Sequence, residues 1–128
     1  MRFLDSSAIV KLALDEPESR ALERYLGGVR FISSELARTE VIRAVRRRAP
    51  ARLERAKDIV GQAHLVSVTQ GNLTEAGQLD PIGLRSLDAI HLASALALGD
   101  ELEVFVAYDD RLLTAASQLG MPVASPGT

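Results

Sequence analysis

Apolar residues recur along this chain in two alternating patterns, one typical of strands and one of helices. Short apolar runs next to Ser, Gly or Asp favour strands, whereas apolar residues three and four positions apart favour amphipathic helices. Strands are predicted at Arg2–Leu4, Val29–Ile32, Leu65–Val68 and Val104–Ala107, with a short edge strand at Val123–Ala124. Helices are predicted over Ala8–Leu14, Pro17–Leu26, Glu35–Arg48, a segment reaching Ala63, Leu73–Leu79, Leu87–Leu98 and Asp110–Leu119. This alternation predicts a three-layer α/β/α fold with a mostly parallel central sheet.

Serine and glycine residues mark where several of these helices are expected to begin and end. The pairs Ser6-Ser7 and Ser33-Ser34, and the single Ser86, are predicted to cap the helices that follow them. Gly27-Gly28 and Gly99 are predicted to end the helices that precede them. The helix after Ser86 is apolar on most of its faces, which predicts burial on more than one side.

The composition is that of an ordinary globular protein and adds three constraints. Of 128 residues, 47% are apolar and 25% are charged, which suits a single domain spanning residues 1–128. There is no cysteine, so disulfides and thiolate metal sites are excluded. Asp5 stands where a signal peptide would need its apolar core, and no apolar run approaches the roughly 20 residues of a membrane span. We therefore expect a cytoplasmic protein.

Positive charge gathers in one segment, although the net charge of the chain is −2. Between Arg38 and Lys57 the basic residues are Arg38, Arg43, Arg46, Arg47, Arg48, Arg52, Arg55 and Lys57, against the acids Glu40 and Glu54. A solvated helical face explains such a segment, and so does contact with a polyanion. The pattern alone leaves both explanations open.

Two aspartates occupy matching positions after predicted strands. Asp5 follows the first strand, and Asp109 lies just beyond the strand Val104–Ala107. In parallel α/β sheets, ligands bind outside the carboxyl ends of strands, at the place where the strand order reverses. Two carboxylates that are far apart in sequence can therefore meet there.

Two further acids lie on predicted helices among apolar neighbours. Asp88 is in the first turn of its helix, where a carboxylate also stabilises the helix dipole, and Glu40 is placed to pair with Arg43. If the fold brings the four acids together, charges about 4 Å apart repel by roughly 4 kcal/mol at an effective dielectric constant of 20. Such a cluster protonates one member or binds a cation, and all-oxygen ligands suit Mg²⁺, with Mn²⁺ as a substitute.

Four short motifs, in this order, resemble those of the PIN-domain nucleases. They are Phe3-Leu4-Asp5-Ser6-Ser7-Ala8, Thr39-Glu40, Asp88-Ala89-Ile90-His91-Leu92-Ala93 and Ala107-Tyr108-Asp109. The resemblance extends over essentially the whole chain, and the short form resembles VapC-type toxins of bacterial type II toxin–antitoxin systems. The resemblance implies a PIN-like fold and a metal-dependent endoribonuclease, a hydrolase that leaves 5′-phosphate ends. One departure is a second acid, Asp110, which is either a helix N-terminal charge or a holder of water.

The resemblance also implies roles for individual residues and for partners. Asp5, Glu40, Asp88 and Asp109 match the family's catalytic acidic quartet, which holds Mg²⁺, and Ser6 matches a hydroxyl that supports the site by hydrogen bonding. A water molecule activated by the metal is expected to attack the phosphorus in line. Arg43 is a candidate to bind a phosphate of the RNA substrate. The family further implies a homodimer and a cognate VapB-like antitoxin that neutralises the toxin.

Other residues and functions are weighed against this interpretation. His91, three residues after Asp88, is expected to be a packed or hydrogen-bonded helix residue, and His64 a surface residue. A phosphotransferase with an aspartyl nucleophile needs a second Asp where Ser7 stands, and a response-regulator receiver needs a lysine after Lys57, where there is none. A catalytically silent PIN-like module that binds RNA or protein stays open as an alternative.

Overall fold

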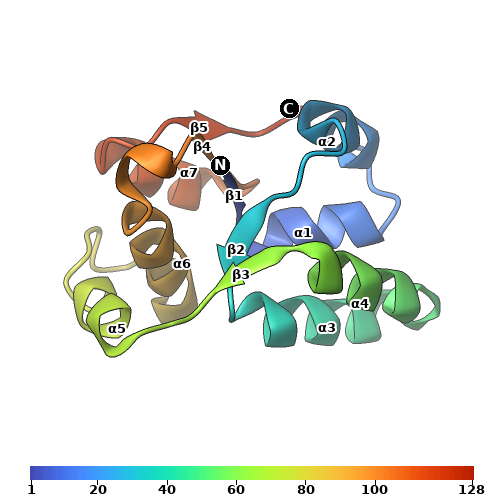
Figure 1. The fold of residues 1–128 in the computed structure, drawn as a ribbon, viewed down its shortest axis with the longest axis horizontal. Coiled ribbons are helices and arrows are strands. Elements are labelled where there is room, and N and C mark those ends of the chain that lie inside the picture. The colour runs from blue at the N-terminus through green and yellow to red at the C-terminus, as the bar shows by residue number, and fades with distance from the viewer.

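A parallel five-stranded sheet forms the centre of the molecule (Figure 1). The computed structural model describes all residues from 1 to 128. The strands are β1 (Arg2–Leu4), β2 (Ile32–Ser34), β3 (His64–Val66), β4 (Val104–Val106) and β5 (Val123–Ala124), in the order β3-β2-β1-β4-β5. Every pairing is parallel, and Phe3 of β1 lies opposite both Ile32 and Phe105. The strand order reverses between β1 and β4, because the chain builds outward from β1 on one side and then on the other.

Helices cover both faces of the sheet. One layer contains α1 (Ser6–Ala13), α2 (Ser19–Leu26), α3 (Ala37–Arg48) and α4 (Leu53–Gln62), with a 3-10 turn at Pro50–Arg52. The other contains α5 (Gln70–Ala76), α6 (Ser86–Leu96) and α7 (Asp110–Gln118), with a 3-10 turn at Gly99–Glu101. In Figure 1 the first layer lies to the right and the second to the left. The predicted three-layer α/β/α architecture is therefore confirmed. No helix is both long and apolar enough to cross a membrane.

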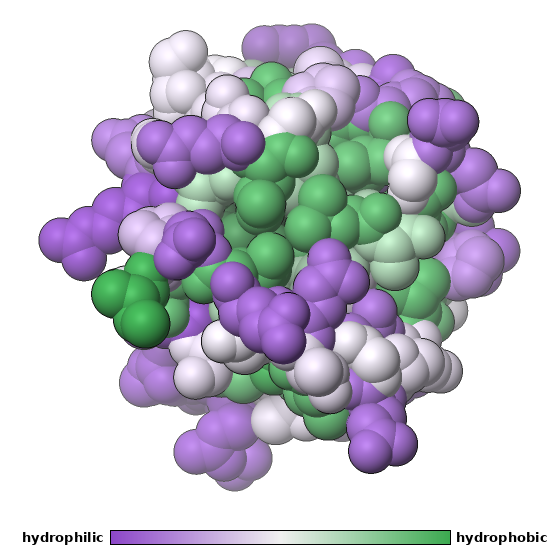
Figure 2. Space-filling model, turned by 90° about the vertical axis from the view of Figure 1, so that its left-hand side faces the viewer, coloured by the Kyte–Doolittle hydropathy of each residue, from purple (hydrophilic) through white to green (hydrophobic).

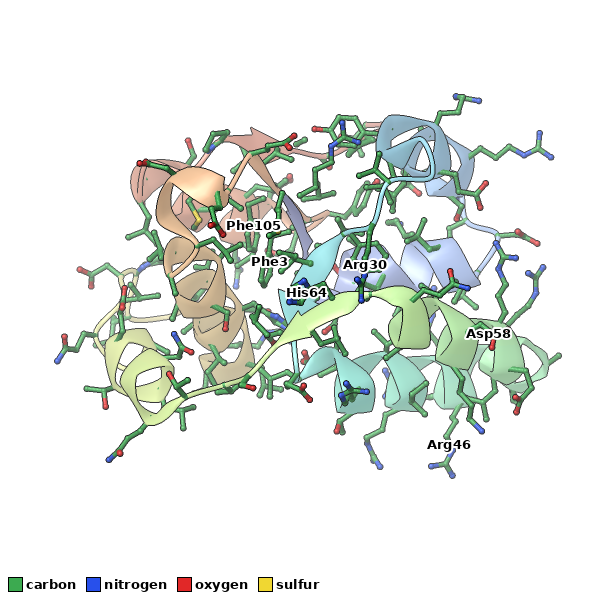
Figure 3. All side chains as sticks on the ribbon, in the orientation of Figure 1. Phe3, Arg30, Arg46, Asp58, His64 and Phe105 are labelled. Carbon is green, nitrogen blue, oxygen red and sulfur yellow. The ribbon has the colours of Figure 1, made fainter.

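The sheet divides the hydrophobic core into two parts. Side chains alternate between the faces of a strand, so Leu4 packs with the α1–α4 layer and its neighbour Phe3 with the α6–α7 layer. Phe3 and Phe105 stack with their ring centroids 5.5 Å apart, on the α6 side of the sheet (Figure 3). Both faces of β1 and β4 are thus apolar, as parallel strands covered on both sides require. These strands therefore carry no polar site residues within their length.

The α5–α7 layer also exposes apolar surface. Figure 2 faces this side of the molecule and shows apolar side chains gathered near the centre of the view. Ile82, in the loop before α6, is 98% exposed, while Leu73 of α5 and Leu87 of α6 are about half exposed. The fold itself leaves these side chains uncovered.

The second strand differs from its prediction. It comprises Ile32–Ser34 rather than Val29–Ile32, and Ser33 and Ser34, predicted to cap a helix, are fully buried in it. The hydroxyl of Ser33 donates to the Leu4 carbonyl at 2.6 Å, and that of Ser34 lies 3.2 Å from Nδ1 of His91. These partners come from distant parts of the chain, so two polar residues can occupy a buried strand.

Two helix caps also differ from prediction. Asp5, rather than Ser6 or Ser7, caps α1, because its carboxylate accepts the Ala8 N–H at 2.9 Å. Ser86 is the first residue of α6, and Arg85 precedes it without a side-chain cap hydrogen bond. The sequence located these helix starts to within two residues but assigned the wrong capping side chains.

Candidate active site

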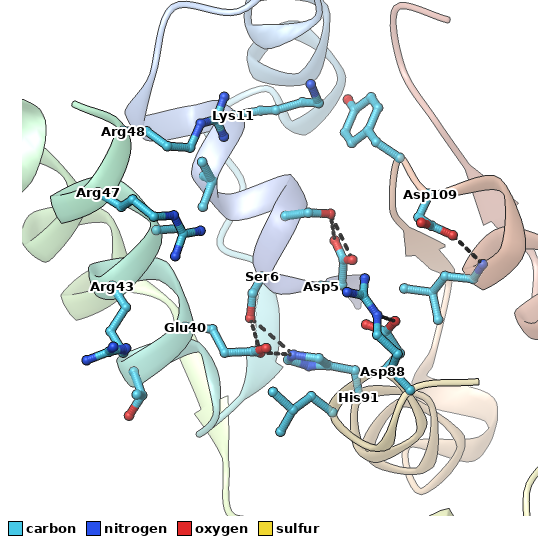
Figure 4. A pocket seen from close by; sticks show the side chains of 18 of the residues that line it. Asp5, Ser6, Lys11, Glu40, Arg43, Arg47, Arg48, Asp88, His91 and Asp109 are labelled. Atoms are coloured by element: carbon cyan, nitrogen blue, oxygen red, sulfur yellow. Dashed lines mark hydrogen bonds and ion pairs between the residues drawn. The ribbon is translucent and has the colours of Figure 1, made fainter. Parts of the chain in front are cut away.

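A cleft of about 680 Å³ opens where β1 and β4 end, at the reversal of strand order. The four acids of the predicted quartet line it together, each from a different element. Asp5 follows β1, Asp109 follows β4 after Ala107 and Tyr108, Glu40 lies on α3, and Asp88 lies in the first turn of α6. Figure 4 shows Asp5, Asp88 and Asp109 along one side of the cleft and Glu40 beside His91 at its base. The fold therefore brings these four side chains to one cavity.

Asp5 is the most deeply buried of these acids, with only 4% of its surface exposed. Its Oδ1 accepts the Ala8 N–H, and the hydroxyl of Ser7 lies 2.9 Å from each of its two oxygens. Burial raises the pKa of Asp5 to about 6, although the hydrogen bonds from Ala8 and Ser7 oppose the rise and the negative charge of Asp88 adds to it. Asp5 is thus a rigidly held carboxylate that lacks a neutralising ion-pair partner.

Asp88 shares this strained electrostatic environment. Burial raises the pKa of Asp88, the nearby Arg85 opposes the rise, and the charges of Asp109 and Glu40 add to it. Nε of Arg85 lies 3.5 Å from Oδ2 of Asp88, but the Arg85 side chain is 82% exposed. An exposed pair of this kind contributes about 0–1 kcal/mol, so Asp88 is easily released from it.

Glu40 is held by a buried histidine and not by the predicted arginine. No ion pair joins Glu40 to Arg43; instead, Oε1 of Glu40 lies 2.6 Å from Nε2 of His91 and accepts the Ser6 hydroxyl at 2.7 Å. Burial pushes the pKa of Glu40 upward, but the hydrogen bonds from His91 and Ser6 outweigh it, so the pKa is lowered. The predicted hydrogen-bonded character of His91 is confirmed, yet its place inside the cleft was not foreseen.

The adjacent acids Asp109 and Asp110 occupy different positions at the start of α7. Asp109 caps α7, because its Oδ1 accepts the Leu112 N–H at 3.0 Å, and it lines the cleft. Asp110 lies in the first turn of α7 and is exposed. It lines a neighbouring hollow, which Asp88 also borders. Its position agrees with the first of the two alternatives, a charge at the helix N-terminus.

The basic segment is split between paired and unpaired side chains. Most members form ion pairs: Arg38 with Glu35, Arg48 with Glu16, Arg52 with Asp15, Arg55 with Glu23 and Lys57 with Glu54. Arg43, Arg46 and Arg47 form none. Arg43 and Arg47 line the cleft opposite the aspartates (Figure 4), and with Arg46 they enclose a further small hollow. The paired members agree with a solvated helical face, whereas the three unpaired arginines are the ones left available to a polyanion.

One cleft residue, Lys11, was not singled out from the sequence. It lies one helical turn after Ser7 on α1, and this spacing is the signal that places both on the face toward the cleft. Its amine lies 3.1 Å from Glu18 and 4.8 Å from the centre of the Tyr108 ring. Burial raises the pKa of Tyr108 to about 12, and its hydroxyl donates to the Pro126 carbonyl. Lys11 and Tyr108 therefore close one end of the cleft.

The donor set suits a hard divalent cation, although each of the four acids has at least one oxygen that contacts the protein. No three of the Asp, Glu and His side chains lie close enough together to hold a metal ion in the arrangement seen. The acids offer oxygen ligands only, which is what Mg²⁺ requires, and Asp5 and Asp88 both have raised pKa values that a nearby cation would lower. In the arrangement seen, Asp88 faces Arg85, whose side chain is mostly exposed.

Comparisons with known proteins agree on one family. The sequence profile described as the PIN domain matches residues 2–117. Ribonuclease VapC46 of Mycobacterium tuberculosis is 47% identical over 125 residues, which span 97% of this chain and 96% of that protein. Ribonuclease VapC47 of the same organism is 38% identical over 133 residues, covering 99% and 98%. The crystal structure of Mycobacterium tuberculosis VapC20, described as a toxin that cleaves the sarcin–ricin loop, superposes with a TM-score of 0.79 at 18% identity, over 98% of this chain and 100% of that one. That last similarity concerns the fold alone.

Proposed function

This chain belongs to the PIN domain family, and from that premise we propose that it is a VapC-type endoribonuclease whose active site is the cleft between β1, β4, α3 and α6. Relatives named as ribonucleases align over nearly its whole length. The observation that carries the proposal is the meeting of Asp5, Glu40, Asp88 and Asp109 in one cavity. A silent module has no need to keep four carboxylates together against their mutual repulsion.

We assign the binding of Mg²⁺, with Mn²⁺ as a substitute, to Asp5 and Asp88, with Glu40 and Asp109 completing the set. When bound, such a cation makes a coordinated water more acidic and offsets the negative charge that develops on the phosphate. The protein's own groups prepare the site: Ser7 and Ala8 fix the Asp5 carboxylate, and Ser6 fixes Glu40. Without a bound cation, the negative charges of the aspartates repel the phosphates of RNA. Cleavage is therefore expected to depend on the metal.

The unpaired arginines of α3 are proposed to bind the RNA backbone. Arg43 and Arg47 face the cleft, and Arg46 extends outward from α3 (Figure 3). Replacing Arg46 and Arg47 by Gln should weaken RNA binding and reduce its salt slope by roughly 0.7 per lost phosphate contact. Arg38→Gln is the matched control on the same helix, because Arg38 is already paired with Glu35. An unchanged slope in the double variant would remove these arginines from the interface.

A VapB-like antitoxin and a second copy of the chain are the proposed protein partners, by extension from the VapC-type relatives. The antitoxin is expected to abolish cleavage when added in equimolar amount. Light scattering of the isolated chain should give the mass of a dimer. Cleavage that persists with the protein encoded beside this gene would reject that protein as the antitoxin.

The test of the function is cleavage of a mixture of structured RNAs with Mg²⁺ and with EDTA. Products should carry 5′-phosphate ends, and Asp88→Asn should be inactive while Asp110→Asn, an adjacent acid outside the cleft, stays active. The silent-module alternative predicts no cleavage and no thermal shift with Mn²⁺. A cation at 100 times its dissociation constant would instead stabilise the protein by about 2.7 kcal/mol.

A further inference from the structure

His91 is a cleft residue that the proposed chemistry does not use. It is 1% exposed, lies on α6 one turn after Asp88, and still lines the cleft. Its ring meets that of Phe3 edge-on, with centroids 6.2 Å apart and planes at 73°. The core therefore fixes the plane of the imidazole, so that each ring nitrogen points in a defined direction.

The hydrogen bonds around His91 hold both of its ring nitrogens. Oγ of Ser34 accepts the Leu36 N–H at 3.2 Å and lies 3.2 Å from Nδ1 of His91. On the other side of the ring, Nε2 lies 2.6 Å from Oε1 of Glu40 and 3.1 Å from Oγ of Ser6. An ionised carboxylate only accepts hydrogen bonds, so Nε2 is the donor to Glu40. These contacts link the end of β2, through α6, to α3.

Glu40 is left with one committed and one free oxygen. Oε1 accepts from both His91 and Ser6, whereas Oε2 forms no hydrogen bond with the protein. In metal sites, ligating carboxylates and imidazoles are themselves held by hydrogen bonds, and losing such a partner typically lowers metal affinity about 10–100-fold. The free oxygen of Glu40 is the one available to the cleft.

We propose that His91 is a positioning residue that acts through Glu40: held by Ser34, it presents one oxygen of Glu40 to a divalent cation in the cleft. The inference rests on the proposed metal role of the acids and extends it to two residues that do not touch the ion. It also ties the site to β2, since Ser34 is fully buried at the end of that strand. The position of Glu40 on α3 relative to α6 thus depends on the contact between Ser34 and His91, which lies behind the cleft.

A matched pair of substitutions separates positioning from simple packing. In His91→Gln the amide nitrogen takes the place of Nε2 and keeps a donor to Glu40, whereas in His91→Asn the shorter side chain can reach only the Ser34 side. Mn²⁺ binding to the metal-free protein is measured by titration calorimetry. We expect His91→Asn to bind about tenfold more weakly or worse, and His91→Gln to retain most of the affinity. Equal affinities in the two variants overturn the proposal.

Ser34→Ala tests whether the effect travels through His91. On the wild-type background it should weaken Mn²⁺ binding, because Nδ1 loses its hydrogen-bond partner; on the His91→Asn background it should cause no further loss. Additive losses would overturn the coupling. Thermal unfolding without metal identifies any variant that fails to fold, and in that case the ¹⁵N NMR spectrum of wild-type His91 decides, since the proposal requires a proton on Nε2.

The same titration separates this inference from the proposed function. If wild-type protein binds Mn²⁺ and the Gln and Asn variants differ as expected, but no RNA is cleaved, the endoribonuclease proposal fails and the role of His91 stands. If RNA is cleaved but the two variants bind Mn²⁺ alike, the role of His91 fails and the nuclease stands. A wild-type chain that binds no Mn²⁺ overturns both.

Discussion

Asp5 and Asp109 have the same local role, capping a helix that follows a strand, in two different environments. Each follows one of two neighbouring parallel strands, and each caps the next helix by accepting the N–H three residues later. Asp5, however, is 4% exposed and held by Ser7, while Asp109 is exposed and followed by a second acid, Asp110. One carboxylate is therefore a desolvated charge, and the other is solvated.

The difference teaches that a shared motif does not imply a shared role. Burial raises the pKa of Asp5 to about 6, which means that the folded protein tolerates its negative charge poorly without a counterion. An exposed carboxylate such as Asp109 is stabilised by water and by the helix N-terminus. We infer that Asp5 is indispensable for holding a cation and that Asp109 is auxiliary.

The largest expected effect is on RNA cleavage. Loss of an outer-shell partner typically costs 10–100-fold, so replacing Asp5, the proposed direct ligand, by Asn should cost more, about a thousandfold. Asp109→Asn should cost about tenfold or less. Both variants keep their helix caps, because Asn caps as well as Asp. Initial rates of RNA cleavage in Mg²⁺ measure the two losses of activity. Equal losses would show that Asp5 and Asp109 do not differ in importance.

The second-largest expected effect is on the free energy of unfolding of the metal-free protein. The pKa of Asp5 in the folded protein, about 6, lies above its ordinary value of 3.8, so folding favours the protonated carboxyl. Its contribution to stability is largest below pH 3.8, is lost as the pH rises to about 6, and stays lost above that. The difference between the two pKa values corresponds to about 3 kcal/mol.

Asp5→Asn should therefore be more stable than the wild type near neutral pH, by up to about 3 kcal/mol, and equally stable near pH 4. Urea unfolding in EDTA at both pH values measures this. Asp109→Asn is the matched control and should change stability little at either pH. A gain for Asp5→Asn that does not depend on pH would point to a cause other than ionisation.

A third, smaller effect concerns the caps themselves. Asp109→Ala removes the acceptor for the Leu112 N–H and should destabilise the protein by about 1 kcal/mol, whereas Asp109→Asn should be nearly neutral. Thermal unfolding near neutral pH distinguishes the two. If the Ala and Asn variants unfold together, the cap hydrogen bond contributes nothing measurable.

The smallest expected effect is a change in the pKa of Asp5 when Ser7 is replaced. Asp109 has no hydroxyl neighbour of this kind. The Ser7 hydroxyl donates to the Asp5 carboxylate and lowers its pKa, so Ser7→Ala should raise that pKa above about 6. The ¹³C shift of the Asp5 carboxyl, followed against pH in metal-free protein, reports the change. A pKa that falls or stays constant would show that this hydrogen bond does not tune the carboxylate.

The sequence predicted the layers and the approximate positions of the strands because those depend on patterns that repeat along the chain. Apolar runs located the five strands, and the positions of Asp5 and Asp109 after two of them predicted where a site could lie. The structure then shows that these two strands, β1 and β4, are neighbours in the sheet. These are properties of whole elements and survive errors of one or two residues.

Properties that depend on tertiary partners were not predictable in the same way. Ser33 and Ser34 looked like cap residues, because nothing local indicates the Leu4 carbonyl and His91 that satisfy them in a buried strand. Glu40 was expected beside Arg43 on its own helix, yet its partner is His91 of α6. For His91 the sequence did offer one signal, its spacing of three residues from Asp88, which puts both on one helix face.

The most direct test of the metal assignment is the anomalous difference map of a crystal of the wild-type chain soaked in Mn²⁺. We predict a peak bonded to carboxylate oxygens of both Asp5 and Asp88, with the Arg85 side chain turned away from Asp88. A well-ordered cleft without such a peak, or a peak bonded to only one of the two aspartates, would contradict the assignment.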